Sequence, residues 1–212
     1  TPKGQTIWLD GARSVPELNA ERETRLAKER EAFWKENAAD AALEKVRALI
    51  NAQAFEEIGT PEIEARGSVE RDGYTIEKLV LQPEPGIVLP ALAFVPDGEV
   101  TAGVIYCHGR DKDAETDPGE ALEEIALGGK LVLAVDLRGI GETENREHMM
   151  GPWALVSVDW DDYFRAYLVG ESFVGMRTED TWGCAMYLGA RLPGEETLEL
   201  VAPGEATLPA LH

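Results

Sequence analysis

The 212-residue sequence predicts an α/β fold in which a mainly parallel sheet is covered by helices and preceded by a helical segment. Three observations support this class. The apolar runs at 102–107 and 131–135 do not alternate with polar residues, which is typical of strands buried on both faces. A helical pattern separates each of them from the next run, the last of which is 197–201. A stretch rich in Ala, Glu, Lys, Arg and Leu comes before all the strands.

The first part of the chain is predicted to be helical. Leu43, Val46 and Ile50 recur at helical spacing, so residues 15–54 predict two amphipathic helices with a break at 37–40. A glycine, a threonine and a proline then punctuate the end of this segment.

The turn residues that follow mark a domain boundary. We predict an N-terminal helical segment at 1–60 and an α/β domain at 61–212. The apolar stretches 75–81 and 88–95 are joined by a short turn at Gly86, which favours an antiparallel pair of strands.

The next elements form a βαβ unit. The buried strand 102–107 is followed by a helix near 120–127, and two glycines end that helix before the strand 131–135. A helical stretch from 161 to 191, interrupted near a glycine, leads to a third central strand at 197–201.

Charge excludes several classes of partner. The 20 Lys and Arg residues stand against 40 Asp and Glu residues, and the net charge of −20 repels phosphate backbones and anionic membranes. No apolar run approaches the roughly 18 to 20 residues of a membrane span. We therefore expect a soluble protein with no nucleic-acid or membrane partner, and the sequence leaves its compartment open between cytoplasmic, periplasmic and secreted.

No pattern in the sequence indicates a metal or a cofactor. Cys107 and Cys184 lie in apolar segments without CxxC spacing or clustered histidines, so we expect two buried thiols. Gly139 and Gly141 lack the third glycine and the following helix of a dinucleotide-binding fingerprint. We expect neither metal nor cofactor.

Ligands of parallel sheets lie beyond the carboxyl ends of the strands, so the residues after the apolar strands are the candidate site. His108 and Gly109 follow the first strand, as an oxyanion-hole loop requires; the alternative is a tight turn whose histidine bonds the loop. Asp136 and Arg138 follow the second strand, where we favour an internal ion pair that holds the loop.

The third strand end has the pattern of a nucleophile elbow, in which a GxSxG sequence holds the nucleophile on a strained turn between strand and helix. The register is Gly204, Glu205, Ala206, Thr207 and Leu208. Ala206 therefore occupies the nucleophile position, and an alanine methyl group cannot attack a carbonyl carbon.

Together these segments resemble the α/β-hydrolase superfamily, and within it the acetyl xylan esterase-like bacterial esterases. The resemblance covers roughly residues 55–212 and is carried, ahead of the elbow, by GYTIEKLVLQPEPGIVLPALAFVP at 73–96, the loop 108–113, DLRGIGET at 136–143 and GMRTEDTWGCAMYL at 175–188.

This resemblance implies ester hydrolysis by a serine nucleophile, a histidine base and an acidic orienter, with two oxyanion donors. By position, His108, Gly109 and Arg110 lie in the first oxyanion and substrate loop, and Thr207 supplies the second N–H.

The pattern departs from this family in its triad. Ala206 replaces the nucleophile, and the last strands, with the acid and the histidine, are missing before His212. Ser172 is an alternative nucleophile, although a capping role suits it better. His148 is an alternative base in a loop, where a histidine is usually incidental.

Two functions follow from these observations. The first is a carboxylic ester hydrolase acting on small acyl esters such as acetyl esters, with carbohydrate as a candidate alcohol. The alternative is a catalytically inactive scaffold that serves as a binding or assembly module, since Ala206 occupies the nucleophile position. In either case the apolar strand 197–201 would lie at an open edge of the sheet. This edge predicts a second chain or a homo-oligomer that completes the sheet. A further hypothesis explains the acidic surface as an adaptation to high salt.

Overall fold

A computed structural model of the chain describes residues 9–145, 160–194 and 197–212. The chain divides into two compact units, Thr1–Val46 and Arg47–His212. The second unit carries the sheet and every candidate site residue that the structure describes.

The first unit is built around the long helix α1 (Val15–Glu36). Its N-terminus is a capping box, because the Ser14 hydroxyl accepts the Glu17 N–H and the Glu17 carboxylate accepts the Ser14 N–H at 2.6 Å. No residue of α1 is buried, which fits its alternating charges. The helix ends at Asn37 and α2 (Ala39–Ile50) follows, so the predicted pair of helices with a break between them is confirmed. The predicted domain boundary after residue 60 stays a prediction.

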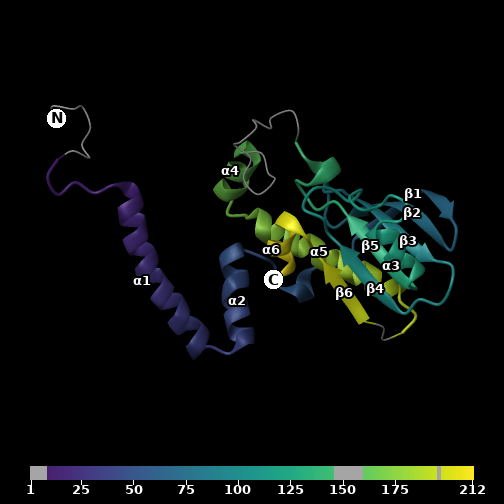
Figure 1. The fold of residues 1–212 in the computed structure, drawn as a ribbon, viewed down its shortest axis with the longest axis horizontal. Coiled ribbons are helices and arrows are strands. Elements are labelled where there is room, and N and C mark those ends of the chain that lie inside the picture. Colours follow the sequence, from purple (N-terminus) through teal and green to yellow (C-terminus); the bar gives the residue numbers. More distant parts are fainter. Residues whose placement is uncertain (1–8, 146–159, 195–196) are drawn as a thin grey trace. The chain divides into compact units, whose positions relative to one another are not determined.

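Six strands of the described residues form one mixed sheet (Figure 1). They are β1 (Glu62–Arg71), β2 (Tyr74–Gln82), β3 (Leu89–Pro96), β4 (Ala102–Tyr106), β5 (Lys130–Val135) and β6 (Thr197–Val201). The order across the sheet is β1-β2-β3-β5-β4-β6. The pairs β1–β2, β2–β3 and β3–β5 are antiparallel, whereas β4 pairs in parallel with both β5 and β6. The predicted antiparallel pair and the predicted parallel βαβ unit are both confirmed, and so is the α/β class.

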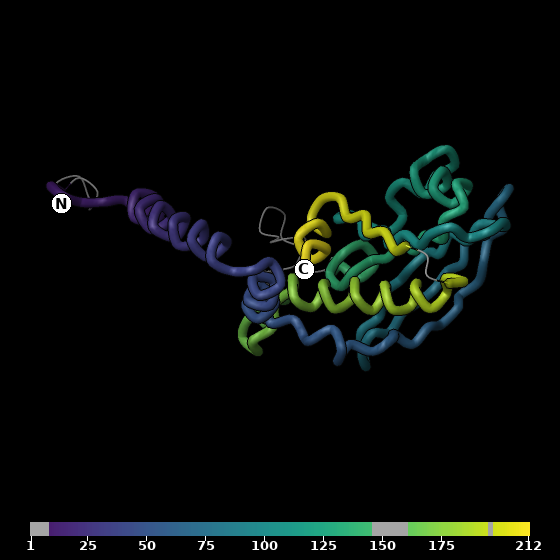
Figure 2. The backbone as a smooth tube through the Cα atoms, turned by 90° about the horizontal axis from the view of Figure 1, so that it is seen from below, coloured from purple at the N-terminus to yellow at the C-terminus, as the bar shows by residue number. Residues whose placement is uncertain are grey.

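Helices cover both faces of this sheet (Figure 2). Helix α3 (Ala121–Leu127) packs with its Leu122 and Ala126 against one face, and α5 (Phe173–Arg191) packs with Cys184 and Leu188 against the other. Successive residues of β4 and β5 enter these two cores alternately, so both strands are buried on both sides. This double burial is the reason that their sequences are continuous apolar runs.

The remaining helices connect the sheet to the candidate site. Helix α4 (Trp160–Leu168) and α5 are separated at Gly170, whose φ of +86° places it in the left-handed region, so the predicted interruption is confirmed. The turn η5 (Gly204–Ala206) and the short helix α6 (Thr207–Ala210) follow β6. The other short turns are η2 (Phe55–Glu57) and η3 (Gly141–Thr143). Within the described part of the chain, no helix combines the length and the apolar character that crossing a membrane would need.

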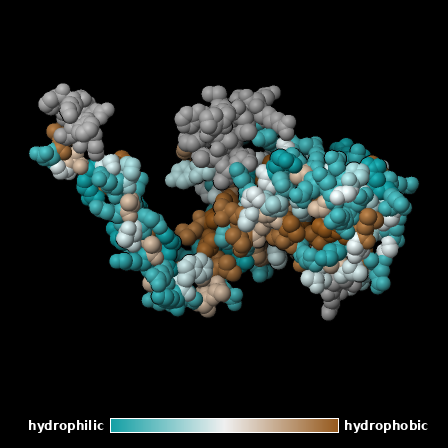
Figure 3. Space-filling model, viewed as in Figure 1, coloured by the Kyte–Doolittle hydropathy of each residue, from teal (hydrophilic) through white to brown (hydrophobic). Residues whose placement is uncertain are grey.

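The sequence did not predict the strand at one edge of the sheet, and it did predict the strand at the other. Strand β1 was not predicted, because nine of its ten residues are exposed and no apolar alternation marks it. Strand β6 is the edge opposite β1 among the described residues, as expected for the apolar strand 197–201. Figure 3 shows apolar residues gathered where β6 and α6 lie, and Leu198, Leu200 and Val201 of β6 are each more than a third exposed.

Candidate functional site

The carboxyl ends of β5, β4 and β6 lie side by side, as the parallel pairing requires. Beyond β4, the Cys107 N–H donates to the Val201 carbonyl at 2.9 Å, and the Gly109 N–H donates to the Pro203 carbonyl at 3.0 Å. The loop after β4 is therefore fastened to the turn after β6. The structure thus brings together two of the strand ends that the sequence singled out.

His108 takes part in a local turn of this loop. Its Nδ1 accepts the Arg110 N–H at 3.0 Å, and its ring stacks on Tyr106 with the ring centroids 6.2 Å apart. The Arg110 side chain is exposed and lies 3.5 Å from the Asp111 carboxylate. This hydrogen bond is the one expected for a tight turn whose histidine bonds the loop.

Gly109 is required by close approach. A Cβ atom at this position would lie 2.5 Å from the Glu205 backbone nitrogen, so no larger residue fits between the two segments. Its own N–H is engaged by Pro203. The backbone of the first loop and the turn after β6 are consequently in direct contact.

In the turn after β6, Gly204 has a left-handed backbone conformation with φ +70°. Ala206 has φ −70° and ψ −14°, which is helical backbone. It is completely buried in the core between the sheet and α5. Thr207 donates its N–H to the Gly204 carbonyl, and its hydroxyl donates to the Ala202 carbonyl at 2.6 Å. The predicted roles of Ala206 and Thr207 stay predictions, and the left-handed residue lies two positions earlier.

The N–H groups of Gly109 and Arg110 in the predicted oxyanion loop, and that of Thr207, each have an acceptor within the chain. Gly109 donates to Pro203, Arg110 to His108 and Thr207 to Gly204. An oxyanion hole needs N–H groups aimed at the position where charge develops. In this geometry these N–H groups stabilise the turns themselves.

A cluster of charged residues that the sequence did not predict connects the loops after β4 and β5. The buried Asp136 carboxylate accepts the Lys112 N–H at 2.5 Å and the Glu142 N–H at 3.0 Å, and the Lys112 ammonium lies 3.5 Å away. Lys112 also pairs with Glu142 and Asp113. Burial raises the pKa of Asp136, and the two backbone hydrogen bonds oppose that rise. A lysine in an acidic loop gave no sequence signal for burial.

Arg138 has other partners than the predicted one. Its guanidinium donates to the Asp180 carboxylate at 2.6 and 2.8 Å and lies 2.8 Å from Glu84, so the expected pair with Asp136 is wrong. The reason is that Asp136 is already satisfied by backbone N–H groups, whereas Arg138 opposes the rise that burial causes in the pKa of Asp180 on α5. The predicted loop-holding role of Arg138 is confirmed by this bidentate pair.

A second arginine, on helix α5, also bonds the loop after β5. The Arg177 guanidinium donates to the carbonyls of Arg138 and Gly139, at 2.8 and 3.3 Å. Burial lowers the pKa of Arg177 to about 10, and the nearby Glu205 carboxylate acts in the opposite direction. The loops after β4, β5 and β6 therefore form one connected layer.

Comparison with known proteins gives the fold. No protein-family model and no curated protein matches this chain. The crystal structure of a Bacteroides fragilis protein assigned as an acetyl xylan esterase is similar with a TM-score of 0.61 and 18% identity, over 79% of this chain and 48% of that one. The chain has an α/β-hydrolase-like fold.

A second solved structure, acetyl xylan esterase 1 from Thermoanaerobacterium sp. JW/SL YS485, has a TM-score of 0.47 and 17% identity, over 72% of this chain and 48% of that one. The chain spans about half the length of each of these two proteins.

Ser172 and His148 are the remaining predicted site residues of this α/β-hydrolase-like unit. The Ser172 hydroxyl caps α5: it accepts the Gly175 N–H at 3.0 Å and donates to the Ile50 carbonyl at 2.5 Å. The favoured capping role of Ser172 is confirmed. His148 lies outside the described residues. Within the described ranges, no group of three or more His, Cys, Asp or Glu residues could hold a metal ion.

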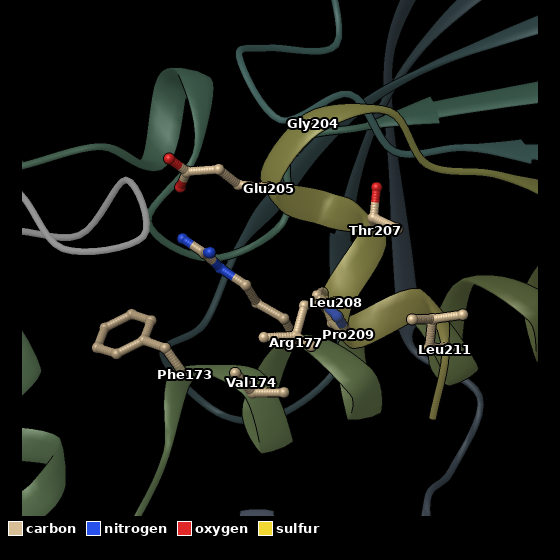
Figure 4. A pocket seen from close by; sticks show the side chains of 9 residues that line it. All are labelled: Phe173, Val174, Arg177, Gly204, Glu205, Thr207, Leu208, Pro209 and Leu211. Atoms are coloured by element: carbon tan, nitrogen blue, oxygen red, sulfur yellow. The ribbon is translucent and has the colours of Figure 1, made fainter. Parts of the chain in front are cut away.

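A pocket of about 300 Å³ opens beside the turn after β6 (Figure 4). Its lining comes from the start of α5 and from the chain after β6: Phe173, Val174, Arg177, Gly204, Glu205, Thr207, Leu208, Pro209 and Leu211. Most of this lining is apolar, and the Arg177 guanidinium lies 5.6 Å from the centre of the Phe173 ring. Figure 4 shows the Arg177 side chain extending toward Glu205.

Proposed function

We propose that residues 47–212 form a catalytically inactive α/β-hydrolase-like scaffold that serves for binding or assembly. The observation that carries this proposal is the turn after β6, where the left-handed residue is Gly204 and the predicted nucleophile position is Ala206. Neither residue has a side chain able to attack a carbonyl carbon. The internal acceptors of the Gly109, Arg110 and Thr207 N–H groups support the same proposal.

The pocket beside this turn supports a binding role. Apolar walls with a few fixed polar groups are typical of small-molecule sites. Here the polar side chains are Arg177, which is 2% exposed, Glu205, and Thr207, whose hydroxyl donates to the Ala202 carbonyl. A scaffold that retains such a pocket needs no nucleophile to bind a ligand.

The proposal predicts no activated serine in this chain. A fluorophosphonate probe reacts only with a serine whose hydroxyl is activated by a neighbouring base, so we expect no labelling of the folded protein. Turnover of p-nitrophenyl acetate is expected to equal that of the heat-denatured chain. Intact mass spectrometry after labelling checks the first point. One probe adduct per folded chain, absent when the chain is denatured before the probe is added, would overturn the inactive-scaffold proposal.

The second candidate is a carboxylic ester hydrolase acting on small acyl esters such as acetyl esters, with carbohydrate as the alcohol. The fold similarity to the Bacteroides fragilis protein favours this candidate, because that protein is assigned as an acetyl xylan esterase. Its nucleophile would then lie away from the turn after β6. Ester turnover above the denatured control, together with an adduct mapped to a serine by peptide mass spectrometry, would establish it.

We also propose that the exposed edge of β6 is covered by a strand from polypeptide outside residues 1–212. An edge strand offers unpaired backbone groups, and Leu198 and Leu200 leave it apolar as well. A second copy is a poor occupant, because each chain carries −20 charges and two copies repel each other.

Native mass spectrometry on protein taken from its own source tests this proposal. We expect a particle heavier than 23.2 kDa that contains either a longer chain or a second, different polypeptide. A lone species of 23.2 kDa, or a dimer of that species, would contradict the proposed occupant.

A further inference from the structure

The backbone angles after β6 show which residue lies at the apex of the turn between the strand and the helix. Pro203 is still extended, with φ −75° and ψ 154°, and the next residue, Gly204, has φ +70°. The η5 turn begins at this glycine. In a nucleophile elbow the nucleophile sits on the strained residue between strand and helix. By this criterion the apex is Gly204, whereas Ala206 already has helical backbone.

The space available to a side chain also distinguishes position 204 from position 206. A Cβ atom built on Gly204 would have as its nearest neighbours the Gly109 Cα at 3.6 Å and the Gly109 nitrogen at 3.8 Å, which are ordinary contacts. The Ala206 methyl group is fully buried in the core cluster. A side chain at 204 would thus enter the space beside the loop after β4, and a larger side chain at 206 would enter the core.

We infer that Gly204, and not Ala206, is the vacated nucleophile position of this fold. The inference rests on the proposed inactive scaffold and refines it, because it places the lost side chain next to the Gly109 loop and above the pocket that Gly204 also lines. The site is a backbone corner with room for the hydroxyl or thiol of one small residue. The GxSxG spacing led to Ala206 because sequence spacing alone does not show which residue has the left-handed backbone conformation.

Cysteine reactivity tests this assignment without any need for catalysis. Gly204→Cys and Ala206→Cys are compared with Gly119→Cys, a glycine at φ +86° with no atom within 4 Å of a built Cβ. The native Cys107 and Cys184 provide a low background, since both are buried and burial raises the pKa of Cys107 to about 12. The rate of reaction with a chromogenic aromatic disulfide is measured at pH 8, with circular dichroism as the check of folding.

We expect one thiol of Gly204→Cys to react at a rate within about tenfold of that of Gly119→Cys, because Gly204 is exposed and a Cβ there makes only ordinary contacts with Gly109. Ala206→Cys is expected to react at least about 100-fold more slowly than Gly119→Cys until denaturant is added, because a buried thiol reacts only after local opening. The reverse order of the two rates would overturn the inference.

Failure of Gly204→Cys to fold while Gly119→Cys folds would also overturn the inference, because it would show that position 204 has no room for a side chain. These readouts are independent of the fluorophosphonate experiment on the wild-type chain. Labelling of a native serine would remove the inactive-scaffold proposal, and the cysteine rates would still report where the apex lies.

Discussion

Replacing Asp180 by alanine is expected to lower the free energy of unfolding by about 3–5 kcal/mol, the cost of removing one partner of a buried ion pair. Asp180 is completely buried and accepts two hydrogen bonds from the Arg138 guanidinium, at 2.6 and 2.8 Å. Without it, the Arg138 guanidinium keeps the more exposed Glu84 carboxylate, 2.8 Å away, as an ionic partner. The loop after β5 would lose its main tether to α5.

Urea unfolding followed by circular dichroism measures this change. Glu84→Gln is the matched control, because it removes the other carboxylate of the same arginine from a position that is 48% exposed. An exposed partner contributes about 0–1 kcal/mol, so the control should change the free energy of unfolding little. Equal losses for the two variants would show that the burial of Asp180 does not set the strength of this tether.

The order of elements in the second unit was predictable because burial on both faces leaves a simple sequence signal. Strands β4 and β5 are continuous apolar runs, and the turn residues Gly86 and Gly170 stand where the chain reverses or a helix ends. Residues buried on neither face leave no such signal, which is why β1 was missed. Its place in the sheet depends on backbone pairing with β2, to which exposed side chains contribute little.

Partners within the site were less predictable than its elements. Arg138 and Asp136 are two residues apart, and sequence proximity suggested that they pair. In the fold, Asp136 is held by N–H groups from two loops, and Arg138 reaches a carboxylate 42 residues away on α5. Hydrogen-bond partners that are distant in sequence are set by packing, so a pattern of spacing does not determine them.

Gly141→Ala is expected to lower the free energy of unfolding by about 2–5 kcal/mol, the sum of two effects. Gly141 has φ +61°, a left-handed conformation that costs an L-residue about 1–2 kcal/mol. A Cβ atom there would also overlap the Asp136 carboxylate, and overpacking typically costs about 1–3 kcal/mol. The carboxylate is not free to move, because it accepts N–H groups from Lys112 and Glu142 and has no exposed surface.

Gly119→Ala separates the two effects, because Gly119 has φ +86° but no atom within 4 Å of a built Cβ. Its expected loss is the backbone cost alone, about 1–2 kcal/mol. Thermal and urea unfolding of both variants measure the difference. A clearly larger loss for Gly141→Ala would show that Asp136 is a rigid support for the loops after β4 and β5. Equal losses would mean that the carboxylate moves aside, and the connected layer beneath the candidate site would then be more deformable than its hydrogen bonds indicate.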